Sequence, residues 1–477
     1  MKQPPSVHVA DLGEKRLARL VFVVTSLGAF MGSLDLSIVN IAFPALERSF
    51  SHDSTAALAW VITAYSITFG SLLVIAGRTS DRLGSRRVFN FGLAVFCGGS
   101  ILCAGAVTVP LLVAGRVIQG AGAAAMLPAS LSLLLGAYPS ERRTHIVSLW
   151  AGIGALAVAT GPTLGATLVS VGGWRWVFLV NAPVGVLAYF MGRRVLRESA
   201  RDRSHHAPDY LGAILILGSL GSLVLAITEG PSWGWASLRV LVAGAATIVL
   251  GAWFIVRCTQ HPEPVLDLTL FRARTFGVAN AATLLYAVAF FAMLLGNILF
   301  LTSVWHYSII VAGLCVTPGP LVVASVAGPA GRIAHRIGFR SILLIGTATF
   351  ALGLMMFALR IGLHREFLTR WLPATLVIGL GIGLTFPVLG AAAVSSLRAE
   401  RYAVGSAVNQ TARQIGGAIG VALLVVLLGA PTSSVMALSR FHDLWFFCAL
   451  MALASGTASA FLSRSSTHAS FVTPGVD

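Results

Sequence analysis

Long apolar stretches dominate the chain, and short polar stretches separate them. Fourteen of the apolar stretches contain about twenty residues or more, which is the length that an α-helix needs to cross the hydrocarbon core of a bilayer. They lie at residues 20–43, 56–76, 88–107, 111–135, 146–170, 175–196, 210–229, 238–257, 275–303, 309–330, 341–361, 371–394, 406–430 and 444–463. The pattern predicts an all-α polytopic membrane protein with fourteen transmembrane helices, and an even number of spans places both termini on one side.

The composition agrees with this prediction. Hydrophobic residues make up 56% of the 477 residues and charged residues only 10%, a balance that a soluble domain could not hide in its core. The five cysteines lie in or beside apolar stretches without C-x-x-C spacing. This arrangement favours neither a disulfide framework nor a zinc site, and we expect no bound metal.

Positive charge is distributed unevenly between the two sides of the predicted membrane. With the N-terminus in the cytoplasm, the cytoplasmic segments contain 24 of the 33 lysines and arginines, the outer segments contain seven, and Arg116 and Arg413 lie within helices. This asymmetry follows the positive-inside rule, so we expect both termini in the cytoplasm. It also explains the net charge of +16 without a nucleic-acid partner. The segment 360–370 is an exception, because it carries three arginines on the predicted outer side.

A ten-residue segment occurs twice. G-R-T-S-D-R-L-G-S-R begins at Gly77 and G-R-I-A-H-R-I-G-F-R begins at Gly331, with five identical positions and an offset of 254 residues. Each copy follows the second helix of a six-helix set, which leaves the seventh and eighth helices as an insertion. Two equivalent bundles that flank a site in mid-membrane are typical of alternating-access carriers. We predict a cytoplasmic tail at 1–19, bundles at 20–196 and 275–463, a linker with two helices at 197–274, and a cytoplasmic tail at 464–477.

Four longer motifs carry more specific information. They are L-D-L-S-I-V-N-I-A-F-P at 34–44, R-V-I-Q-G-A-G-A-A-A-M-L-P-A-S-L-S-L-L at 116–134, E-G-P-S-W-G-W at 229–235 and R-Q-I-G-G-A-I-G-V-A at 413–422. Together they resemble the major facilitator superfamily, specifically its fourteen-helix drug:proton antiporters and, among these, antibiotic exporters of the methylenomycin-resistance type. The resemblance covers about residues 20–464. It implies the major facilitator fold, with two six-helix bundles plus two inserted helices, and a monomer.

Asp35 and Arg116 are ionisable residues inside predicted transmembrane helices. Asp35 lies eight residues before the outer end of its helix, and Arg116 lies six residues after Pro110, near the outer start of its own helix. These separations correspond to about 12 Å and about 9 Å at 1.5 Å per residue. Their similar depth makes them candidate partners. Burial disfavours an ionised carboxylate and a nearby cation favours it, so Asp35 could bind and release a proton. The alternatives are a neutral Asp35 bonded to a neighbouring helix and an Arg116 bonded to backbone carbonyls.

In the resembled family, this aspartate is associated with proton coupling or with recognition of cationic substrates. Ser33, Ser37 and Asn40 lie within about 60° of one another at 100° per residue, and Asp35 points to nearly the opposite side of the helix. Either Asp35 faces a central cavity or the fourth helix, or the Ser/Asn stripe faces the cavity. Small hydroxyl residues are common in contacts between membrane helices, which favours the first arrangement.

The segment 77–87 resembles the family's cytoplasmic loop between the second and third helices, which acts as a conformational latch between the bundles. The resemblance implies latch roles for Gly77, Asp81, Arg82, Gly84 and Arg86. The two glycines allow a tight turn, and Asp81 either caps the third helix or pairs with arginines. A solvated basic turn is the alternative.

The stretch G-I-G-A-L-A-V-A-T-G-P-T-L-G-A at 152–166 is similar to the fifth-helix motif that marks exporters in this superfamily. Gly161, Pro162 and Gly165 match the motif, whereas Ala157 and Ala166 stand where glycine is usual. Small residues allow close helix packing and a proline allows a bend. The resemblance therefore implies a hinge that moves during switching.

Other polar and aromatic residues in the predicted helices are candidates to line a substrate cavity, and packing inside the bundles is the alternative for each of them. These candidates are Asn40, Trp60, Tyr65, Gln119, Asn409 and Arg413. Phe290 and Phe291 would offer aromatic surface to a lipophilic cation, with packing again as the alternative.

The function expected from these features is proton-driven export of lipophilic, often cationic, drugs or antibiotics across the cytoplasmic membrane, with the proton gradient as energy source and no cofactor. A proton-linked uptake permease for a small metabolite is the alternative, which the fifth-helix motif disfavours. The chain contains no H-E-x-x-H motif, nucleophile elbow or nucleotide-binding loop, so we expect neither an enzyme with catalytic residues nor an ATP-driven pump. The expected partners are a small-molecule substrate and the lipid bilayer.

Overall fold

A computed structural model describes residues 7–198, 208–398 and 401–462. These residues form helices, turns and short irregular segments, without a β-strand among them. The helices are α1 (Val7–Ser49), α2 (Thr55–Leu83), α3 (Ser85–Ala104), α4 (Val109–Ala137), α5 (Ser140–Gly172), α6 (Arg175–Leu179), α7 (Asn181–Val195), α8 (Tyr210–Trp233), α9 (Leu238–Gln260), η1 (Leu268–Arg272), α10 (Arg274–Ser303), α11 (Ile309–Val316), α12 (Pro318–Ile337), α13 (Phe339–Arg360), η2 (Phe367–Trp371), α14 (Leu372–Val394), α15 (Tyr402–Leu428) and α16 (Ser434–Ala460).

The described part of the chain contains fourteen helical spans that are long and apolar enough to cross a membrane. Each predicted stretch corresponds to one of them, so the predicted fold class is confirmed. The helices extend beyond several predicted ends, because helical hydrogen bonds continue where the chain leaves the hydrocarbon and becomes polar. For example, α1 continues through Pro44 to Ser49, and α16 begins at Ser434, ten residues before the predicted start at residue 444.

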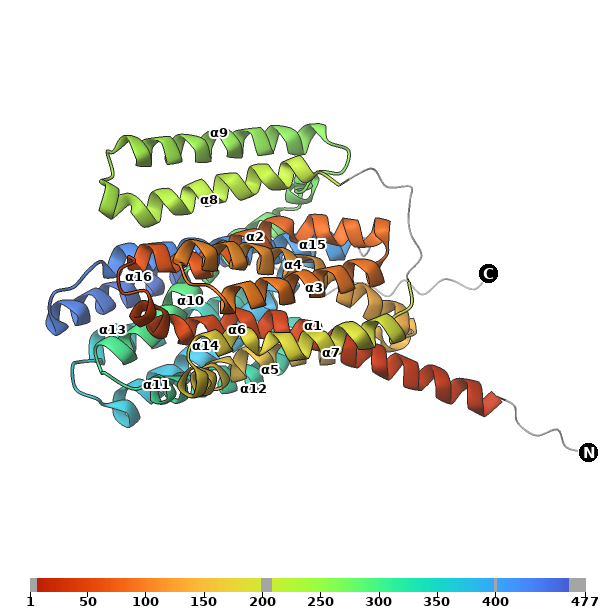
Figure 1. The fold of residues 1–477 in the computed structure, drawn as a ribbon, viewed down its shortest axis with the longest axis horizontal. Helices are drawn as coiled ribbons and strands as arrows, with labels where there is room; N and C mark the ends of the chain where they lie inside the picture. The colour runs from red at the N-terminus through yellow and green to blue at the C-terminus, as the bar shows by residue number, and fades with distance from the viewer. Residues whose placement is uncertain (1–6, 199–207, 399–400, 463–477) are drawn as a thin grey trace, which may run out of the picture.

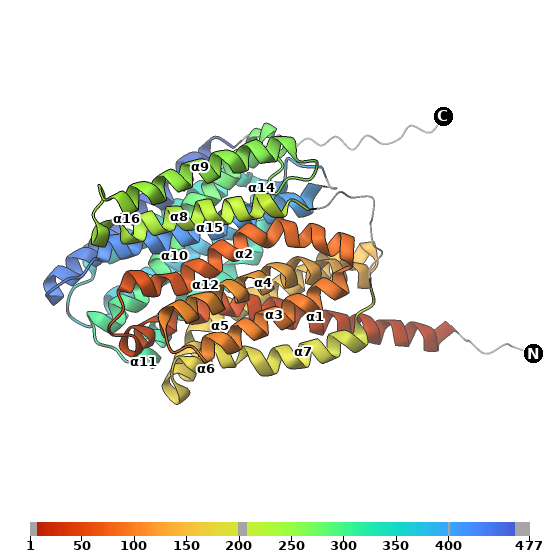
Figure 2. The same cartoon turned by 45° about the horizontal axis from the view of Figure 1, so that its top comes forward.

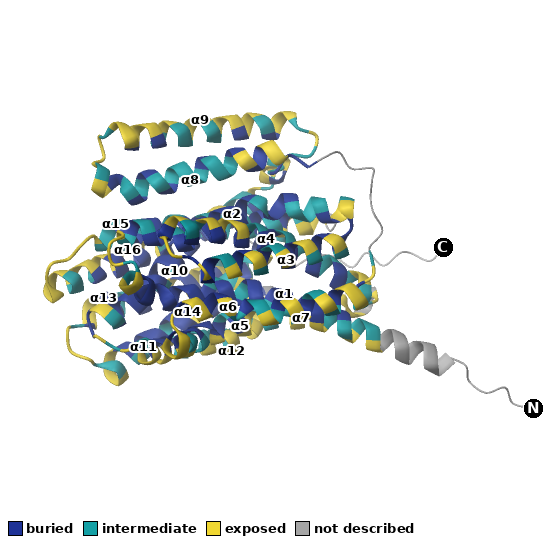
Figure 3. Ribbon diagram, in the orientation of Figure 1, coloured by how far each residue is buried: buried dark blue, intermediate teal, exposed yellow. Residues whose placement is uncertain are grey.

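The helices form two bundles and a peripheral hairpin, with most helix axes along the long dimension of the molecule (Figure 1). Helices α1–α7 make the N-terminal bundle and α10–α16 the C-terminal bundle, and α8 and α9 pack together beside α2 and α15. Figure 2 shows the α8–α9 hairpin at the edge of the molecule from a second direction. The burial pattern agrees, since α10 is mostly buried and α9 mostly exposed (Figure 3). The insertion of two helices between the bundles is thus visible in the fold.

The internal repeat has the same local structure in both bundles. Gly84 is the single residue between α2 and α3, and Gly338 is the single residue between α12 and α13. Both adopt a positive φ, +100° and +85°, which glycine tolerates at little cost. The two glycines are separated by the offset of 254 residues found in the sequence. The prediction of a loop over 77–87 was wrong, because one glycine supplies the turn and the flanking polar residues continue the helices.

The two bundles contact each other along α2 with α15, along α5 with α11 and α12, and along α1 with α10 and α11. Along the first contact, between α2 and α15, the hydroxyl of Thr411 donates a hydrogen bond to the carbonyl oxygen of Gly70 at 2.8 Å. Along the second, between α5 and α11 with α12, the hydroxyls of Thr163 and Thr317 lie 2.6 Å apart. A Cβ atom on Gly313 would lie 2.9 Å from the carbonyl oxygen of Pro162. Together with the contact of α1, these contacts define how the bundles are related in this conformation.

The segment between α9 and α10 joins the hairpin to both bundles. Glu263 lies 4.0 Å from Arg78 of α2, and Asp267 lies 3.6 Å from Arg401 beside the start of α15. At the same end of the hairpin, Asp209 caps α8 and accepts a hydrogen bond from Arg257 of α9 at 2.7 Å. Ion pairs therefore fix this end of the hairpin to the rest of the molecule.

Candidate functional site

Asp35 and Arg116 form a buried ion pair between α1 and α4. Nη1 of Arg116 lies 2.6 Å from Oδ2 of Asp35, and each residue is only 1% exposed. Glycines on α4 allow the neighbouring helices to enclose the pair. A Cβ atom on Gly115 would lie 2.7 Å from Sγ of Cys103, and one on Gly120 would lie 2.8 Å from the carbonyl oxygen of Tyr65. The structure thus brings together the two residues that their depth had suggested as partners.

Gln119, one turn after Arg116 on α4, binds both members of the pair. Its Nε2 donates to Oδ1 of Asp35 at 2.8 Å, and its Oε1 accepts from Nη1 of Arg116 at 2.6 Å. Nε of Arg116 donates to the carbonyl oxygen of Val61 on α2 at 2.7 Å. Both carboxylate oxygens therefore accept hydrogen bonds, which offsets part of the cost of burying two charges.

The network continues to α3 and α7. Nε2 of Gln119 also donates to the hydroxyl of Ser100 at 2.8 Å, and that hydroxyl oxygen accepts from Nδ2 of Asn181 at 3.3 Å. The guanidinium carbon of Arg116 lies 4.2 Å from the centre of the Tyr65 ring, within the range of a cation–π interaction. Five helices of the N-terminal bundle (α1, α2, α3, α4 and α7) thus enclose the ion pair. A substrate can reach Asp35 only if these helices move.

The polar stripe of α1 packs against α5. The hydroxyl of Ser37 donates to the carbonyl oxygen of Val158 at 3.1 Å, and a Cβ atom on Gly154 would lie 3.0 Å from the hydroxyl of Ser33. Asn40 is buried and donates to the carbonyl oxygen of Leu36 in its own helix. Of the two arrangements left open by the sequence, the structure has Asp35 facing α4 and the stripe packed against a helix.

The predicted latch residues lie around the junction of α2 and α3, within the N-terminal bundle. Arg86 donates from its backbone N–H to Oε1 of Glu198 at 3.2 Å and from Nη2 to the carbonyl oxygen of Arg193 at 2.6 Å. Asp81 and Arg82 lie in the last turn of α2, and the carboxylate of Glu198 accepts a hydrogen bond from the first turn of α3. Gly77 lies on α2 where it faces Pro128 of α4.

The predicted hinge residues lie where α5 meets both α1 and the second bundle. A Cβ atom on Gly161 would lie 2.5 Å from the hydroxyl of Ser37, and one on Gly165 would lie 2.4 Å from Cγ2 of Ile41. Pro162 lies inside α5, and its carbonyl oxygen faces Gly313 of α11. This part of α5 thus packs closely against α1 of its own bundle and α11 of the other bundle.

The candidate cavity residues do not gather in one place. Tyr65 and Gln119 belong to the network around the ion pair, whereas Trp60 packs in the apolar cluster formed with α8 and α15. Asn409 donates hydrogen bonds to Thr283 and Asn280 of α10, at 2.9 Å and 3.2 Å. Arg413 is half-buried, and its guanidinium lies 5.6 Å from the centre of the Phe386 ring.

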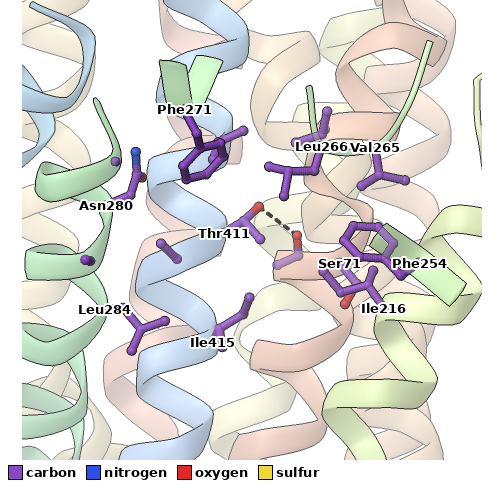
Figure 4. Close-up of a pocket in the computed structure, with 16 residues that line it drawn as sticks. Ser71, Ile216, Phe254, Val265, Leu266, Phe271, Asn280, Leu284, Thr411 and Ile415 are labelled. Atoms are coloured by element: carbon purple, nitrogen blue, oxygen red, sulfur yellow. Dashed lines mark hydrogen bonds between the residues drawn. The ribbon is translucent and has the colours of Figure 1, made fainter. Parts of the chain in front are cut away.

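A cavity of about 280 Å³ lies between the α8–α9 hairpin, the segment before α10, and helices α2, α10 and α15 (Figure 4). Its lining is apolar except for Ser71, Asn280 and Thr411. The cavity therefore lies at the seam between the bundles and the inserted hairpin, and its lining includes none of the residues predicted as sites.

Comparison with known families decides the classification. The family model described as Major Facilitator Superfamily matches residues 25–421. The chain belongs to this superfamily. It is accordingly a transporter in a membrane, with a small-molecule substrate, and not an enzyme.

Several relatives within the superfamily are resistance proteins. Multidrug resistance protein Stp of Mycobacterium tuberculosis (strain CDC 1551 / Oshkosh) is 34% identical over 88% of this chain and 78% of that protein. Methylenomycin A resistance protein of Bacillus subtilis (strain 168) is 33% identical over 86% of this chain and 87% of that protein. Tetracenomycin C resistance and export protein of Streptomyces glaucescens is 30% identical, over 89% and 77% respectively. The predicted resemblance to multidrug and antibiotic exporters is confirmed.

Solved structures with the same fold include more distant members of the superfamily. A partially occluded inward-open xylose transporter XylE from E. coli aligns with a TM-score of 0.66 and 13% identity, over 94% of this chain and 99% of that chain. An auto-inhibited POT family peptide transporter aligns with a TM-score of 0.68 and 16% identity, over 96% and 99%. These similarities establish the fold.

Sequence reasoning missed several residues that complete the site. Ser100 and Asn181 extend the network around Asp35, and Glu198 binds the α2–α3 junction. The signal available in the sequence was a polar residue within an apolar stretch, such as Asn181 within the stretch 175–196. A single polar residue does not show which neighbouring helix it faces, so its partners became visible only in the fold.

Proposed function

We propose that this superfamily member is a proton-coupled antiporter that exports lipophilic drugs or antibiotics across the cytoplasmic membrane by alternating access. The enclosed pair of Asp35 and Arg116 carries the proposal, because an ionisable group inside a membrane is costly and usually functional. The names of the relatives, which refer to multidrug, methylenomycin and tetracenomycin resistance, support the direction of transport and the class of substrate.

In this proposal Asp35 is the proton-linked carboxylate and Arg116 modulates it. When Asp35 is ionised, its two oxygens accept hydrogen bonds from Arg116 and Gln119. Protonation removes the attraction to Arg116 and converts one oxygen into a donor, so the bonds between α1 and α4 must rearrange. Proton binding thereby favours a different arrangement of these two helices.

Two connections lead from the ion pair to the contacts between the bundles. On α1, Ser37 bonds to α5 next to Gly161 and Pro162, which face α11. On α2, Val61 accepts a hydrogen bond from Arg116, and Gly70 further along the helix accepts one from Thr411 of α15. A proton and a substrate that stabilise different arrangements of the two bundles oppose each other's binding. Binding of one is therefore coupled to release of the other.

The remaining roles follow from position. Gly161, Pro162 and Gly165 act as the hinge of α5, and the junction of α2 and α3 acts as the latch, with Gly77, Asp81, Arg82, Gly84 and Arg86. The protein works as a monomer with both termini in the cytoplasm. The proton gradient supplies the energy, and neither a cofactor, ATP nor a nucleic acid takes part.

Inverted membrane vesicles with an acidified interior and a pH-sensitive dye test the proposal. Adding a transported drug to vesicles with the wild-type protein should release protons, and Asp35→Asn should abolish this response. Asp443→Asn is the matched control, because Asp443 is an exposed residue of α16. Full proton-coupled efflux by Asp35→Asn would show that the role given to Asp35 is wrong. Drug movement in the same direction as the protons would indicate uptake instead of export.

A further inference from the structure

Arg413 is a cation in mid-membrane without a compensating charge. It is the twelfth of 27 residues in α15, about 16 Å from the start of the helix at 1.5 Å per residue. Among the described residues it takes part in no hydrogen bond or ion pair, and it is half-buried. A guanidinium at this depth is costly unless it is paired or borders an aqueous space. The side chain therefore keeps its hydrogen-bond donors available.

The carboxylate in the middle of α1 does not neutralise this charge. Both oxygens of Asp35 are bonded to Arg116 and Gln119 inside the N-terminal bundle, so the charges of that ion pair cancel. The interior of the C-terminal bundle is left with one positive charge. In this conformation the membrane interior therefore favours an anionic guest over a cationic one.

Aromatic rings surround the guanidinium on one side. Phe386 of α14 lies 5.6 Å from it, and Phe290 of α10 meets the Phe386 ring edge-on at 4.9 Å. Arg413, Phe386 and Phe290 are all half-buried, although α10 is one of the most enclosed helices. Partial exposure of three touching side chains on three helices of one bundle indicates that they border the same space.

This space is distinct from the cavity in Figure 4. Val408, Thr411, Ala412 and Ile415 line that cavity from one side of α15. At 100° per residue, Arg413 points about 150° away from the middle of that side. The guanidinium and the cavity thus lie on opposite sides of α15.

We propose that Arg413, Phe386 and Phe290 form a substrate subsite for a lipophilic aromatic molecule that carries an anionic group, such as a carboxylate or a phenolate. This inference rests on the proposed export function and names the substrate class. A guanidinium binds a carboxylate through two parallel charge-assisted hydrogen bonds, and aromatic rings favour edge-to-face contacts with a flat guest. A cationic guest would be repelled. Asp35 alone would predict a cationic substrate, whereas this subsite favours an anionic one.

A matched set of fluorescent probes tests the inference on the purified full-length protein in detergent. The probes are anthracene-9-carboxylate, anthracene-9-carboxamide and 9-anthracenylmethylammonium, which share the aromatic body and differ in charge. Fluorescence anisotropy gives the Kd of each. We expect wild type to bind the carboxylate about tenfold or more tightly than the amide, as for a hydrogen bond to a charged group, and the ammonium probe most weakly.

Variants assign the preference to Arg413. Arg413→Gln should reduce the difference between the carboxylate and the amide to about twofold or less, and Arg413→Lys should retain part of it because the charge remains. Arg440→Gln, at an exposed position of α16, should match wild type. Unchanged binding of the amide by Arg413→Gln shows that the variant is folded.

Two results would overturn the inference: tighter binding of the ammonium probe by wild type, or an undiminished carboxylate preference in Arg413→Gln. The first needs no variant, so it holds even if Arg413→Gln does not fold. Binding does not depend on proton movement. A carboxylate preference that requires Arg413, together with no drug-dependent proton release in vesicles, would refute the proposed antiport and leave the subsite standing.

Discussion

At the scale of single residues, the ion pair of Asp35 and Arg116 is notable because almost every polar atom in it has a partner. Gln119 bonds to both side chains, Val61 accepts from Arg116, and Ser100 bonds to Gln119. Burying two charges is stabilising only when such additional hydrogen bonds exist. The pair is therefore sensitive to the loss of any one member.

Removing only the cation should destabilise the protein. Arg116→Leu leaves the Asp35 carboxylate buried without its counter-ion, and the expected loss is about 3–5 kcal/mol in the free energy of unfolding. The double variant Asp35→Asn/Arg116→Leu should recover most of that stability, because no charge remains to be compensated, and should still lack proton release. Thermal unfolding in detergent and the vesicle assay measure the two effects. Equal stability of Arg116→Leu and wild type would contradict the importance of the pair.

Removing the side-chain amide of Gln119, which binds both Asp35 and Arg116, should also destabilise the protein, but by less. Gln119→Leu deprives Oδ1 of Asp35 and the hydroxyl of Ser100 of a partner, and a buried polar group left unpaired costs about 1–3 kcal/mol. Gln410→Leu serves as the control, because Gln410 is half-buried in α15 and takes part in no interaction with the described residues. Thermal unfolding should therefore separate the two variants, and the same melting temperature for both would count against the network.

The sequence predicted part of this site and left part of it out. Counting residues from the helix ends placed Asp35 and Arg116 at one depth, because depth depends only on the rise per residue. The rotation of α1 stayed open until the contact of Ser37 with α5 was known. The partners Ser100 and Asn181 lie on helices distant in sequence, and one sequence without a fold does not reveal which helices are neighbours.

At the scale of helices, glycines decide how closely α5 approaches α1. Gly161 and Gly165 face Ser37 and Ile41 with too little space for a Cβ atom, whereas Gly152 on the same helix has no neighbouring atom within 4 Å of its Cβ position. Small residues at helix contacts allow close packing in membranes. The closest approach of α5 to α1 thus lies in the part of α5 that also meets the second bundle.

Gly161→Ala should therefore impair transport, since its methyl group would lie 2.5 Å from the hydroxyl of Ser37 and push the helices apart. Gly152→Ala is the matched control, and it should be neutral or raise stability by about 0.5–1 kcal/mol through better helix propensity. Adding Ser37→Gly to Gly161→Ala removes the clashing hydroxyl and should restore part of the transport. Drug efflux from cells measures all three variants. A Gly161→Ala variant as active as Gly152→Ala would show that the spacing of α1 and α5 is unimportant.

Helix positions were predictable from hydrophobic length, but helix ends and turns were not. All fourteen spans were found because each needs about twenty apolar residues, and hydrophobicity is a property of the sequence alone. The segment 77–87 is polar in sequence, yet α2 continues through it to Leu83 and only Gly84 is non-helical. Polarity shows that a segment leaves the membrane, and it does not show that the segment leaves the helix.

At the scale of the whole molecule, the contact of α5 with α11 and α12 joins the two bundles and offers a direct test of alternating access. Thr163 of α5 and Thr317 beside α12 lie 2.6 Å apart at their hydroxyls, although they belong to different bundles. If the bundles must separate here once in each cycle, a covalent bond at this point stops transport. If they do not, the bond has no effect on the rate.

The test replaces both threonines by cysteine in a variant whose five native cysteines have been changed to alanine. Oxidation of Thr163→Cys/Thr317→Cys should abolish drug efflux, and a reductant should restore it, because only the reduced protein can part the bundles. Ser222→Cys/Thr247→Cys is the matched control, since these hydroxyls lie 3.0 Å apart within the α8–α9 hairpin and not between the bundles. Its oxidation should leave efflux unchanged. Continued transport by the first variant after complete cross-linking would mean that α5 and α12 stay together throughout the cycle, and the bundles would then have to open elsewhere, where α2 meets α15 or α1 meets α10.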